Sequence, residues 1–283
     1  MTRLVLGLFL AATTGGFMEE PDRAILKRRA SEAGRPSGLE PGAWLARVGM
    51  TFVGTPYVAG RLEEGTVERL VCDLEALDCV TFIEVTLALA TCLWQGETPL
   101  DRAFATELAR WRYRAGRPEG WSSRLHYSST WAAVHQDRGR LEDVTGQLGG
   151  RPEARAIRFM TDHPDKYPAL ADPLNLAALR EEERRLSDRA EPSLPVRALQ
   201  PSGSGLKEGD IILVLSERPG LDVQHLGMAV RRGQGSLAFL HAPRPGRKVS
   251  VAPGTLADYL ASGRDVRGVR VLRWQPPARS GQI

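Results

Sequence analysis

Hydrophobic and polar positions follow different patterns in the two halves of the chain, and the first half contains one long apolar run. Residues 79–94 read CVTFIEVTLALATCLW, and Glu84 is the only charged residue among them. A run of this length exceeds a normal strand, so it predicts a buried helix in spite of its β-branched residues. Asp78 is then the N-cap and Cys79 the first helical residue.

Further helices are expected around this run. Local composition and apolar positions at helical spacing predict them at residues 43–49, 101–116, 152–163 and 175–190. Residues 95–200 are therefore expected to form a long, mainly helical section. Within it, residues 120–139 (GWSSRLHYSSTWAAVHQDRG) are unusually rich in hydroxyl groups, Trp and His for a connecting segment.

The pattern changes after residues 201–205 (PSGSG). Four short β-rich segments follow, separated by Gly or Pro turns, at residues 209–216, 224–232, 236–242 and 268–274. They predict an antiparallel sheet. Helices first and strands afterwards indicate an α+β fold, with the 79–94 helix packed on the sheet. We expect a single domain over residues 17–283, with a large helical insertion at about 95–200 between that helix and a sheet at about 206–275.

The N-terminal residues have the order of a secretory signal peptide. Arg3 is followed by an apolar run from Leu4 to Ala12 and then by small residues, and the first acid is Glu19. The run is too short to cross a bilayer, so no stable membrane span is expected. Residues 1–16 are therefore predicted to be a signal peptide, and the protein to be periplasmic or secreted. The alternative is a buried N-terminal helix, since the segment has no A-x-A cleavage site.

Composition narrows the class of protein. The chain is 42% apolar and 25% charged, as ordinary globular proteins are. Its 38 Lys and Arg against 34 Asp and Glu leave a net charge of +4 that is spread along the chain. This spread argues against a nucleic-acid partner and fits, weakly, an anionic surface such as a cell wall. We expect a monomer.

The three cysteines, Cys72, Cys79 and Cys92, raise the possibility of thiol chemistry. An odd count leaves one thiol outside any disulfide framework, and the spacings of 7 and 13 fit no usual zinc site. No metal or organic cofactor is expected. Cys92 lies inside the predicted helix and is expected to be structural. Cys79, at the positive end of the helix dipole, is either a small buried hydrophobe or a nucleophile.

A thiol nucleophile needs an imidazole base close to it in space, and two histidines are candidates. His225 begins one predicted strand and His241 ends the next. A three-residue turn at 232–234 places the two imidazoles opposite each other on one face, whereas a two-residue turn puts them on opposite faces. The alternative is that both are surface or satisfied core histidines.

If His225 and His241 lie on the same face of the sheet, the two imidazoles can act together on the Cys79 thiol. His225 takes the proton of the Cys79 thiol, and His241 bonds the other ring nitrogen of His225 and fixes its tautomer. The backbone N–H of Cys79, at the start of its helix, is then available to stabilise an oxyanion.

Six segments carry a resemblance to known proteins. In chain order they are FVGTPYVAG, LDCVTF, SRLHYSSTW, KEGDIILV, DVQHLGMAV and LHAP, over about residues 52–271. Together they resemble the N-acetylmuramoyl-L-alanine amidase-like family of bacterial cell-wall enzymes, in the NlpC-type, papain-like superfamily. The resemblance implies a papain-like NlpC-type fold in which Cys79 is the nucleophile, His225 the base and His241 the residue that orients the base.

The same resemblance implies a substrate. It points to hydrolysis of an amide in peptidoglycan or a muropeptide, through acyl transfer to the thiol. NlpC-type endopeptidases, which cut between D-glutamate and the diamino acid, often read DCSGF where this chain reads DCVTF. Val80 replaces the Ser that, with the Asp, holds the free amine of L-alanine, so cleavage between N-acetylmuramic acid and L-alanine is favoured. The endopeptidase, a lipid-directed thiol acyltransferase and a non-catalytic wall-binding module are the alternatives.

Four residues are candidates for substrate binding. Asp78 adjoins the nucleophile, and Tyr57 precedes it in a Gly/Pro loop, where the ring could equally pack on the helix. Arg124 and His126 are expected to form a wall of the substrate groove, or else to belong to a packed helix-loop. His135 and His163 are expected to face solvent.

Overall fold

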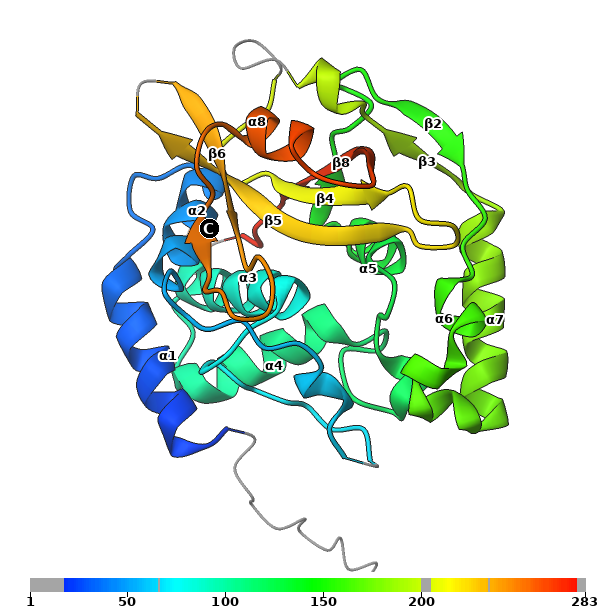
Figure 1. The fold of residues 1–283 in the computed structure, drawn as a ribbon. Helices are drawn as coiled ribbons and strands as arrows, with labels where there is room; N and C mark the ends of the chain where they lie inside the picture. Colours follow the sequence, from blue (N-terminus) through cyan, green and yellow to red (C-terminus); the bar gives the residue numbers. More distant parts are fainter. Residues whose placement is uncertain (1–17, 66, 200–204, 234, 279–283) are drawn as a thin grey trace, which may run out of the picture.

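The computed structural model describes residues 18–65, 67–199, 205–233 and 235–278 (Figure 1). The predicted signal peptide, residues 1–16, lies outside the described residues. In the view of Figure 1 a twisted sheet crosses the upper part of the molecule, most helices lie below or beside it, and the short helix α8 (Leu256–Ala261) lies above it.

An antiparallel sheet of six strands forms the centre of the fold, in the order β1-β8-β4-β5-β6-β7. The strands are β1 Leu141–Asp143, β4 Ile211–Ser216, β5 Val223–Arg232, β6 Ser236–His241, β7 Ser250–Val251 and β8 Val266–Trp274. β4, β5, β6 and β8 confirm the four predicted strands, with ends displaced by one or two residues at most. The predicted α+β class is therefore confirmed.

The helices account for most of the remaining described chain. They are α1 Glu20–Ala33, α2 Pro41–Thr51, α3 Cys79–Gln95, α4 Leu100–Arg112, α5 Ser128–Asp137, α6 Phe159–Asp162 and α7 Pro173–Ser187. Single 3-10 turns occur at Arg61–Glu63, Trp121–Ser123, Pro164–Lys166, Pro168–Ala171 and Val196–Ala198. α2, α3, α4 and α7 confirm predicted helices, and α3 begins at Cys79 as expected.

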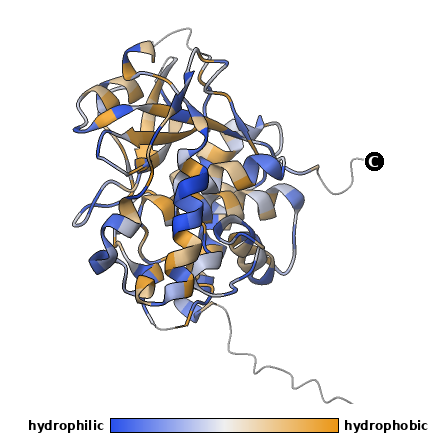
Figure 2. Ribbon diagram, turned by 90° about the vertical axis from the view of Figure 1, so that its right-hand side faces the viewer, coloured by the Kyte–Doolittle hydropathy of each residue, from blue (hydrophilic) through white to orange (hydrophobic). Residues whose placement is uncertain are grey.

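Two apolar layers enclose the sheet. Along β4, Ile211 and Leu213 belong to the layer shared with α2 and α3, whereas Ile212 and Val214 belong to the layer shared with α8. This alternation is the side-chain period of a strand, and every residue of β4 is buried because both faces are covered. Figure 2 shows the matching concentration of hydrophobic segments in the sheet and the helices next to it.

α3 is the central helix, and it is buried on all sides from Thr81 to Cys92. The Trp44 indole of α2 donates a hydrogen bond to the Ala90 carbonyl at 3.1 Å. Glu84, the one charged residue of α3, is neutralised within the core, because the Arg112 guanidinium of α4 donates to the Glu84 carboxylate at 2.7 Å. An apolar sequence thus produced the predicted buried helix, and one ion pair fixes it to α4.

Part of the predicted helical section between residues 95 and 200 is not helical. Residues 152–163 were expected to form one helix, and this prediction is wrong. They lie partly in β2 (Arg151–Ala154), which pairs with β3 (Ala190–Ser193), and α6 covers only four residues. Pro152 removes a backbone donor, and pairing with a distant segment outweighs the local helical propensity. The same section also supplies β1, at the edge of the main sheet.

α1 was not predicted. Its sequence, EPDRAILKRRASEA, carries charge on most of its surface, and only Asp22, Leu26 and Ala33 are buried. A helix that contacts the core through so few side chains leaves almost no periodic hydrophobic signal.

The register of β5 and β6 differs from the expected one. Arg232 pairs with Ser236 and Gly227 with His241, whereas a turn at 232–234 would have paired Arg231 with Gly235. His225 therefore lies diagonally from His241, two residues from the directly opposed position. A shift of two residues preserves the face, so the two histidines still share one face of the sheet.

No helix in the described ranges is long and apolar enough to cross a membrane.

Candidate active site

The N-terminus of α3 presents Cys79 as its first residue, and Asp78 caps the helix as predicted. The Asp78 carboxylate accepts hydrogen bonds from the backbone N–H of Val80 at 3.0 Å and of Thr81 at 2.8 Å. The Thr81 hydroxyl accepts from the Asp78 N–H at 2.9 Å, which completes a capping box. Asp78 thus has a structural role that fixes where the thiol lies.

Cys79 is partly buried at the junction of α3 and β5. Burial raises the pKa of the thiol to about 12, and the adjacent Asp78 charge adds to this effect. The backbone N–H groups of Leu226, Cys79 and Val80 point at the sulfur and oppose the shift. Leu226 directly follows His225 in β5, so the contact places the sulfur against the strand segment that carries the candidate base. The thiol is neutral in this state of the protein.

The two predicted histidines are in direct contact. His225 Nε2 lies 2.8 Å from His241 Nδ1, with the ring planes at 78° and the centroids 5.0 Å apart. Burial lowers the pKa of His225 to about 3, helped by His241, and burial also lowers the pKa of His241 to about 4. Both imidazoles are therefore neutral at neutral pH, and one nitrogen of the contact donates while the other accepts.

Cys79 packs against the layer that α3 shares with the sheet, and the imidazoles lie on the opposite face of β5. Leu226 belongs to the layer shared with α3, so His225 and Gly227 point to the face that carries α8. Among the described residues, the side-chain hydrogen bonds of the imidazoles join them to each other and to Tyr259. Catalytic contacts are often long in ligand-free enzymes and shorten once substrate is bound.

Gly227 allows the close approach of β6 to β5 beside this pair. It lies opposite His241, and a Cβ at this position would come within 2.5 Å of the Phe239 ring and 2.7 Å of the Leu240 carbonyl oxygen. Real Cβ contacts are not this short, so only glycine fits without a displacement of β6.

Two tyrosines lie close to the candidate nucleophile. Tyr57, a predicted site residue, is half-buried, and burial with the nearby charges of Cys79 and Asp78 raises its pKa to about 12. Tyr259 of α8 was missed in the sequence. Its hydroxyl lies 3.3 Å from His241 Nδ1, and the pKa of this tyrosine is raised by burial and by Cys79. The six-residue helix that carries it had no periodic signal to reveal it.

Arg124 and His126 belong to a different part of the molecule. Arg124 is buried, and it bonds Glu63 at 2.7 Å and Glu68 at 3.0 Å. His126 Nε2 lies 2.9 Å from the Trp121 carbonyl oxygen, and burial lowers its pKa to about 3. Within the described ranges, neither bonds Cys79, His225 or His241. Arg124 and Trp121 line a separate cavity of about 610 Å³.

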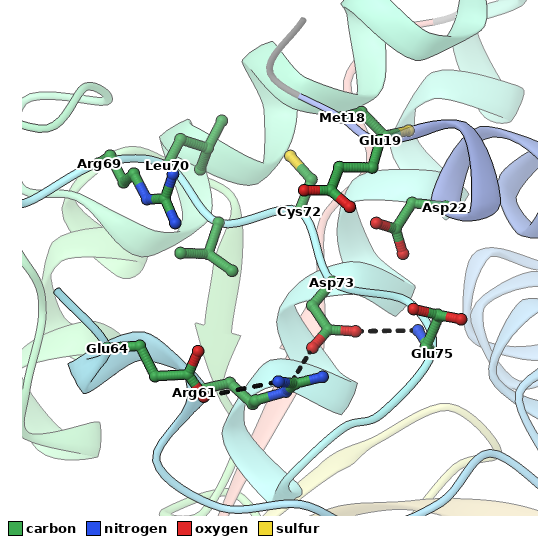
Figure 3. Close-up of a pocket in the computed structure, with 11 residues that line it drawn as sticks. Met18, Glu19, Asp22, Arg61, Glu64, Arg69, Leu70, Cys72, Asp73 and Glu75 are labelled. Atoms are coloured by element: carbon green, nitrogen blue, oxygen red, sulfur yellow. Dashed lines mark hydrogen bonds and ion pairs between the residues drawn. The ribbon is translucent and has the colours of Figure 1, made fainter.

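A second cavity, of about 510 Å³, lies between the start of α1 and residues 61–75 (Figure 3). Acidic side chains dominate its lining, and the Arg61 guanidinium bonds Asp73 across it at 2.8 Å. Cys72 lies in its wall, and burial raises the pKa of this thiol to about 11. Cys92 is fully buried in α3, and burial raises its pKa as well. Both of these thiols are buried, whereas Cys79 is partly exposed.

The expectation that His135 and His163 face solvent is wrong for His135. Its ring is fully buried between Trp111 and Trp131, and its Nε2 lies 2.9 Å from the Trp111 carbonyl oxygen. His163 is half-buried, stacks on Phe159 and bonds the Phe159 carbonyl at 2.7 Å. In the part of the chain that the structure describes, no group of three or more His, Cys, Asp or Glu could hold a metal ion.

Comparison with known proteins identifies the class of protein to which this chain belongs. Residues 47–268 match the AmiA-like family, described as N-acetylmuramoyl-L-alanine amidase-like. The N-acetylmuramoyl-L-alanine amidase of Bacteroides uniformis is 34% identical, with a TM-score of 0.77, and the match covers 83% of this chain and 99% of that one. A Bacteroides fragilis protein provisionally described as a xylanase is 39% identical, with a TM-score of 0.74 and coverage of 80% and 98%.

A Legionella pneumophila protein, at 19% identity and a TM-score of 0.66 over 92% of this chain and 96% of that one, shares the fold. A search of the curated proteins finds no match. The fold and these similarities define an α+β protein of the amidase-like class. Within that class, the chain belongs to the N-acetylmuramoyl-L-alanine amidase-like family, as the six sequence segments implied.

Proposed function

We propose that this protein is a cysteine-dependent amidohydrolase with an NlpC-type, papain-like arrangement, and that it cuts the amide between N-acetylmuramic acid and L-alanine in peptidoglycan or muropeptides. One observation carries the proposal: the Cys79 sulfur lies against the N–H of Leu226, and the preceding residue, His225, is hydrogen-bonded to His241. Because peptidoglycan lies outside the cytoplasmic membrane, we expect the protein to act in the periplasm or after secretion.

The proposed reaction uses His225 through the ring nitrogen that does not face His241. His225 Nδ1 takes the thiol proton, and the Cys79 thiolate attacks the lactyl carbonyl carbon. The backbone N–H of Cys79 stabilises the oxyanion. As the C–N bond breaks, the imidazolium returns the proton to the L-alanine nitrogen, which leaves as a free amine. Water, deprotonated by His225, then hydrolyses the thioester and releases the sugar acid and the thiol.

Both the thiol and the imidazole are neutral in the ligand-free protein. Burial keeps the pKa of Cys79 near 12 and that of His225 near 3, so the ligand-free protein holds no thiolate–imidazolium pair. Proton transfer then accompanies attack on the substrate.

The chemistry around Asp78 supports the amidase over the endopeptidase. Endopeptidases of the NlpC type hold the amine of L-alanine with an Asp and a Ser, and Val80 offers no hydroxyl here. Asp78 Oδ1 already accepts from two backbone N–H groups and from the Thr81 hydroxyl at 2.9 Å. The family membership points in the same direction.

Digestion of purified muropeptides tests the proposal. The wild type should release free stem peptides and sugars that end in a lactyl carboxylate, as identified by mass spectrometry. Cys79→Ala should abolish this release, whereas the matched control Cys72→Ala, which removes a buried thiol elsewhere, should retain it. An L-alanyl-D-glutamate product would replace the amidase by the endopeptidase, and unchanged muropeptides with the wild type would refute both.

A further inference from the structure

Tyr259 is held rigidly beside the histidine pair. It lies on α8, whose start is fixed by a capping box in which the Thr255 hydroxyl accepts from the Asp258 N–H at 3.1 Å. Its ring packs 4.9 Å from the Phe239 ring and 4.7 Å from the His241 ring, centroid to centroid. These contacts bring its hydroxyl to 3.3 Å from His241 Nδ1, the atom that also faces His225.

The proton between the histidines decides whether His225 can be a base. If His225 Nε2 carries the proton and donates it to His241 Nδ1, then His225 Nδ1 is free to accept the thiol proton. If His241 Nδ1 carries the proton instead, the remaining proton of His225 lies on Nδ1 and the base is blocked. The active tautomer therefore requires an unprotonated His241 Nδ1.

A count of donors shows which tautomer Tyr259 favours. When His241 Nδ1 is unprotonated, its single lone pair accepts from the His225 N–H at 2.8 Å and is shared by the Tyr259 O–H at 3.3 Å. When Nδ1 is protonated, its N–H is used by His225 Nε2 at 2.8 Å, and the Tyr259 proton loses its acceptor. The active tautomer thus gives the Tyr259 O–H a shared acceptor that the other tautomer lacks, and a half-buried hydroxyl without an acceptor is disfavoured.

We propose that Tyr259 is a positioning residue, which selects the active tautomer of the His225–His241 pair through a hydrogen bond to His241 Nδ1. The inference rests on the proposed function of this site. The pKa of Tyr259 is raised by burial and by Cys79, so the hydroxyl remains a donor through neutral pH.

The charged and titratable groups that face the cluster come from several elements. Cys79 and Asp78 approach from the start of α3, Tyr57 from the preceding loop and Arg244 from the segment after β6. Tyr259→Phe leaves all of them in place and keeps the ring contacts, so it changes the hydroxyl alone.

Two measurements test the role of this hydroxyl. In Tyr259→Phe, kcat for muropeptide hydrolysis should fall about three- to tenfold, the effect of one hydrogen bond, while KM stays the same. In protein labelled with ¹⁵N-histidine, the His241 Nδ1 resonance should move from the unprotonated toward the protonated position. Tyr167→Phe, which removes a half-buried hydroxyl away from the pair, is the matched control and should change neither.

The NMR measurement separates this inference from the proposed function, because it needs no substrate. An inactive wild type with the expected shift change would refute the amidase and keep the tautomer role. A Tyr259→Phe protein with wild-type His241 resonances would overturn the role, whatever its activity. A loss of stability with unchanged resonances and unchanged kcat would also overturn it, since a merely structural tyrosine behaves in this way.

Discussion

At the scale of single residues, the candidate site depends on two histidine side chains and on a glycine next to them. His225 and His241 contact each other at 2.8 Å, and Gly227, directly opposite His241, lets β6 approach β5 closely because it has no Cβ. Leu226 turns to the other face and offers its N–H to Cys79. Glycine at position 227 is therefore needed for the close approach of β6, the strand that carries His241.

Gly227→Ala tests this dependence. The new Cβ would meet the Phe239 ring at 2.5 Å, so β6 has to move. We expect a loss of about 1 to 3 kcal/mol in the free energy of unfolding, typical of overpacking. Displacement of His241 should lower kcat/KM about tenfold or more, since small misplacements of catalytic groups have large effects.

Urea unfolding and muropeptide hydrolysis measure the two effects. Gly146→Ala is the control, because a Cβ at this exposed glycine meets no atom within 4 Å and its backbone is not in the left-handed region. A Gly227→Ala protein as stable and as active as the control would contradict the steric argument.

At the scale of elements, α3 joins Cys79, the proposed nucleophile, to the core, and the neighbouring helix α4 anchors α3. The Glu84–Arg112 pair is almost wholly inaccessible, with side chains 3% and 2% exposed. Arg112 also donates to the Val71 carbonyl at 2.5 Å, so it ties the segment before Cys79 to the same anchor. A buried pair of this kind is sensitive to removal of one partner only.

Arg112→Met leaves the Glu84 carboxylate buried without its cation. We expect a loss of about 3 to 5 kcal/mol in the free energy of unfolding. The double variant Arg112→Met with Glu84→Leu should recover most of it, because two apolar side chains of similar size replace the pair. Denaturant unfolding of the single and double variants gives the comparison.

Arg184→Met is the control for this experiment, since its exposed pair with Glu181 should contribute little. If Arg112→Met were no less stable than Arg184→Met, the pair would not be the anchor that we infer.

At the scale of the whole molecule, burial of neutral histidines links the fold to pH. Burial lowers the pKa of His135 from 6.5 to about 3, with smaller contributions from Arg140 and Arg138. Below pH 6.5 the unfolded chain binds a proton that the folded chain does not bind, so this residue makes stability fall as the pH falls toward 3.

His135→Gln isolates that contribution. Between pH 7 and pH 5 the wild type should lose about 2 kcal/mol more than the variant in the free energy of unfolding, because one proton fewer is linked to unfolding. Urea unfolding at the two pH values, at constant ionic strength, measures the difference. Equal losses in the two proteins would show that His135 does not remain neutral in the fold.

Local signals in the sequence were sufficient for the elements that carry the chemistry. The apolar run after Asp78 and the capping preference of Asp gave the start of α3 to the residue. Short β-rich segments separated by Gly or Pro turns predicted β4, β5, β6 and β8. The elements that failed, α1 and residues 152–163, bury few side chains or pair with distant strands, and neither property leaves a local pattern.

The sequence by itself determined the α+β class, the position of Cys79 at a helix start and the family, because these depend on local periodicity, capping and motifs in order. Only the tertiary structure decided which side chains meet. It joined His225 to His241 diagonally, brought Tyr259 of α8 to the same nitrogen, placed Arg124 in the lining of a separate cavity and placed His126 against Trp121. Register, chain crossing and burial set these contacts, and they are properties of paired elements that no single segment encodes.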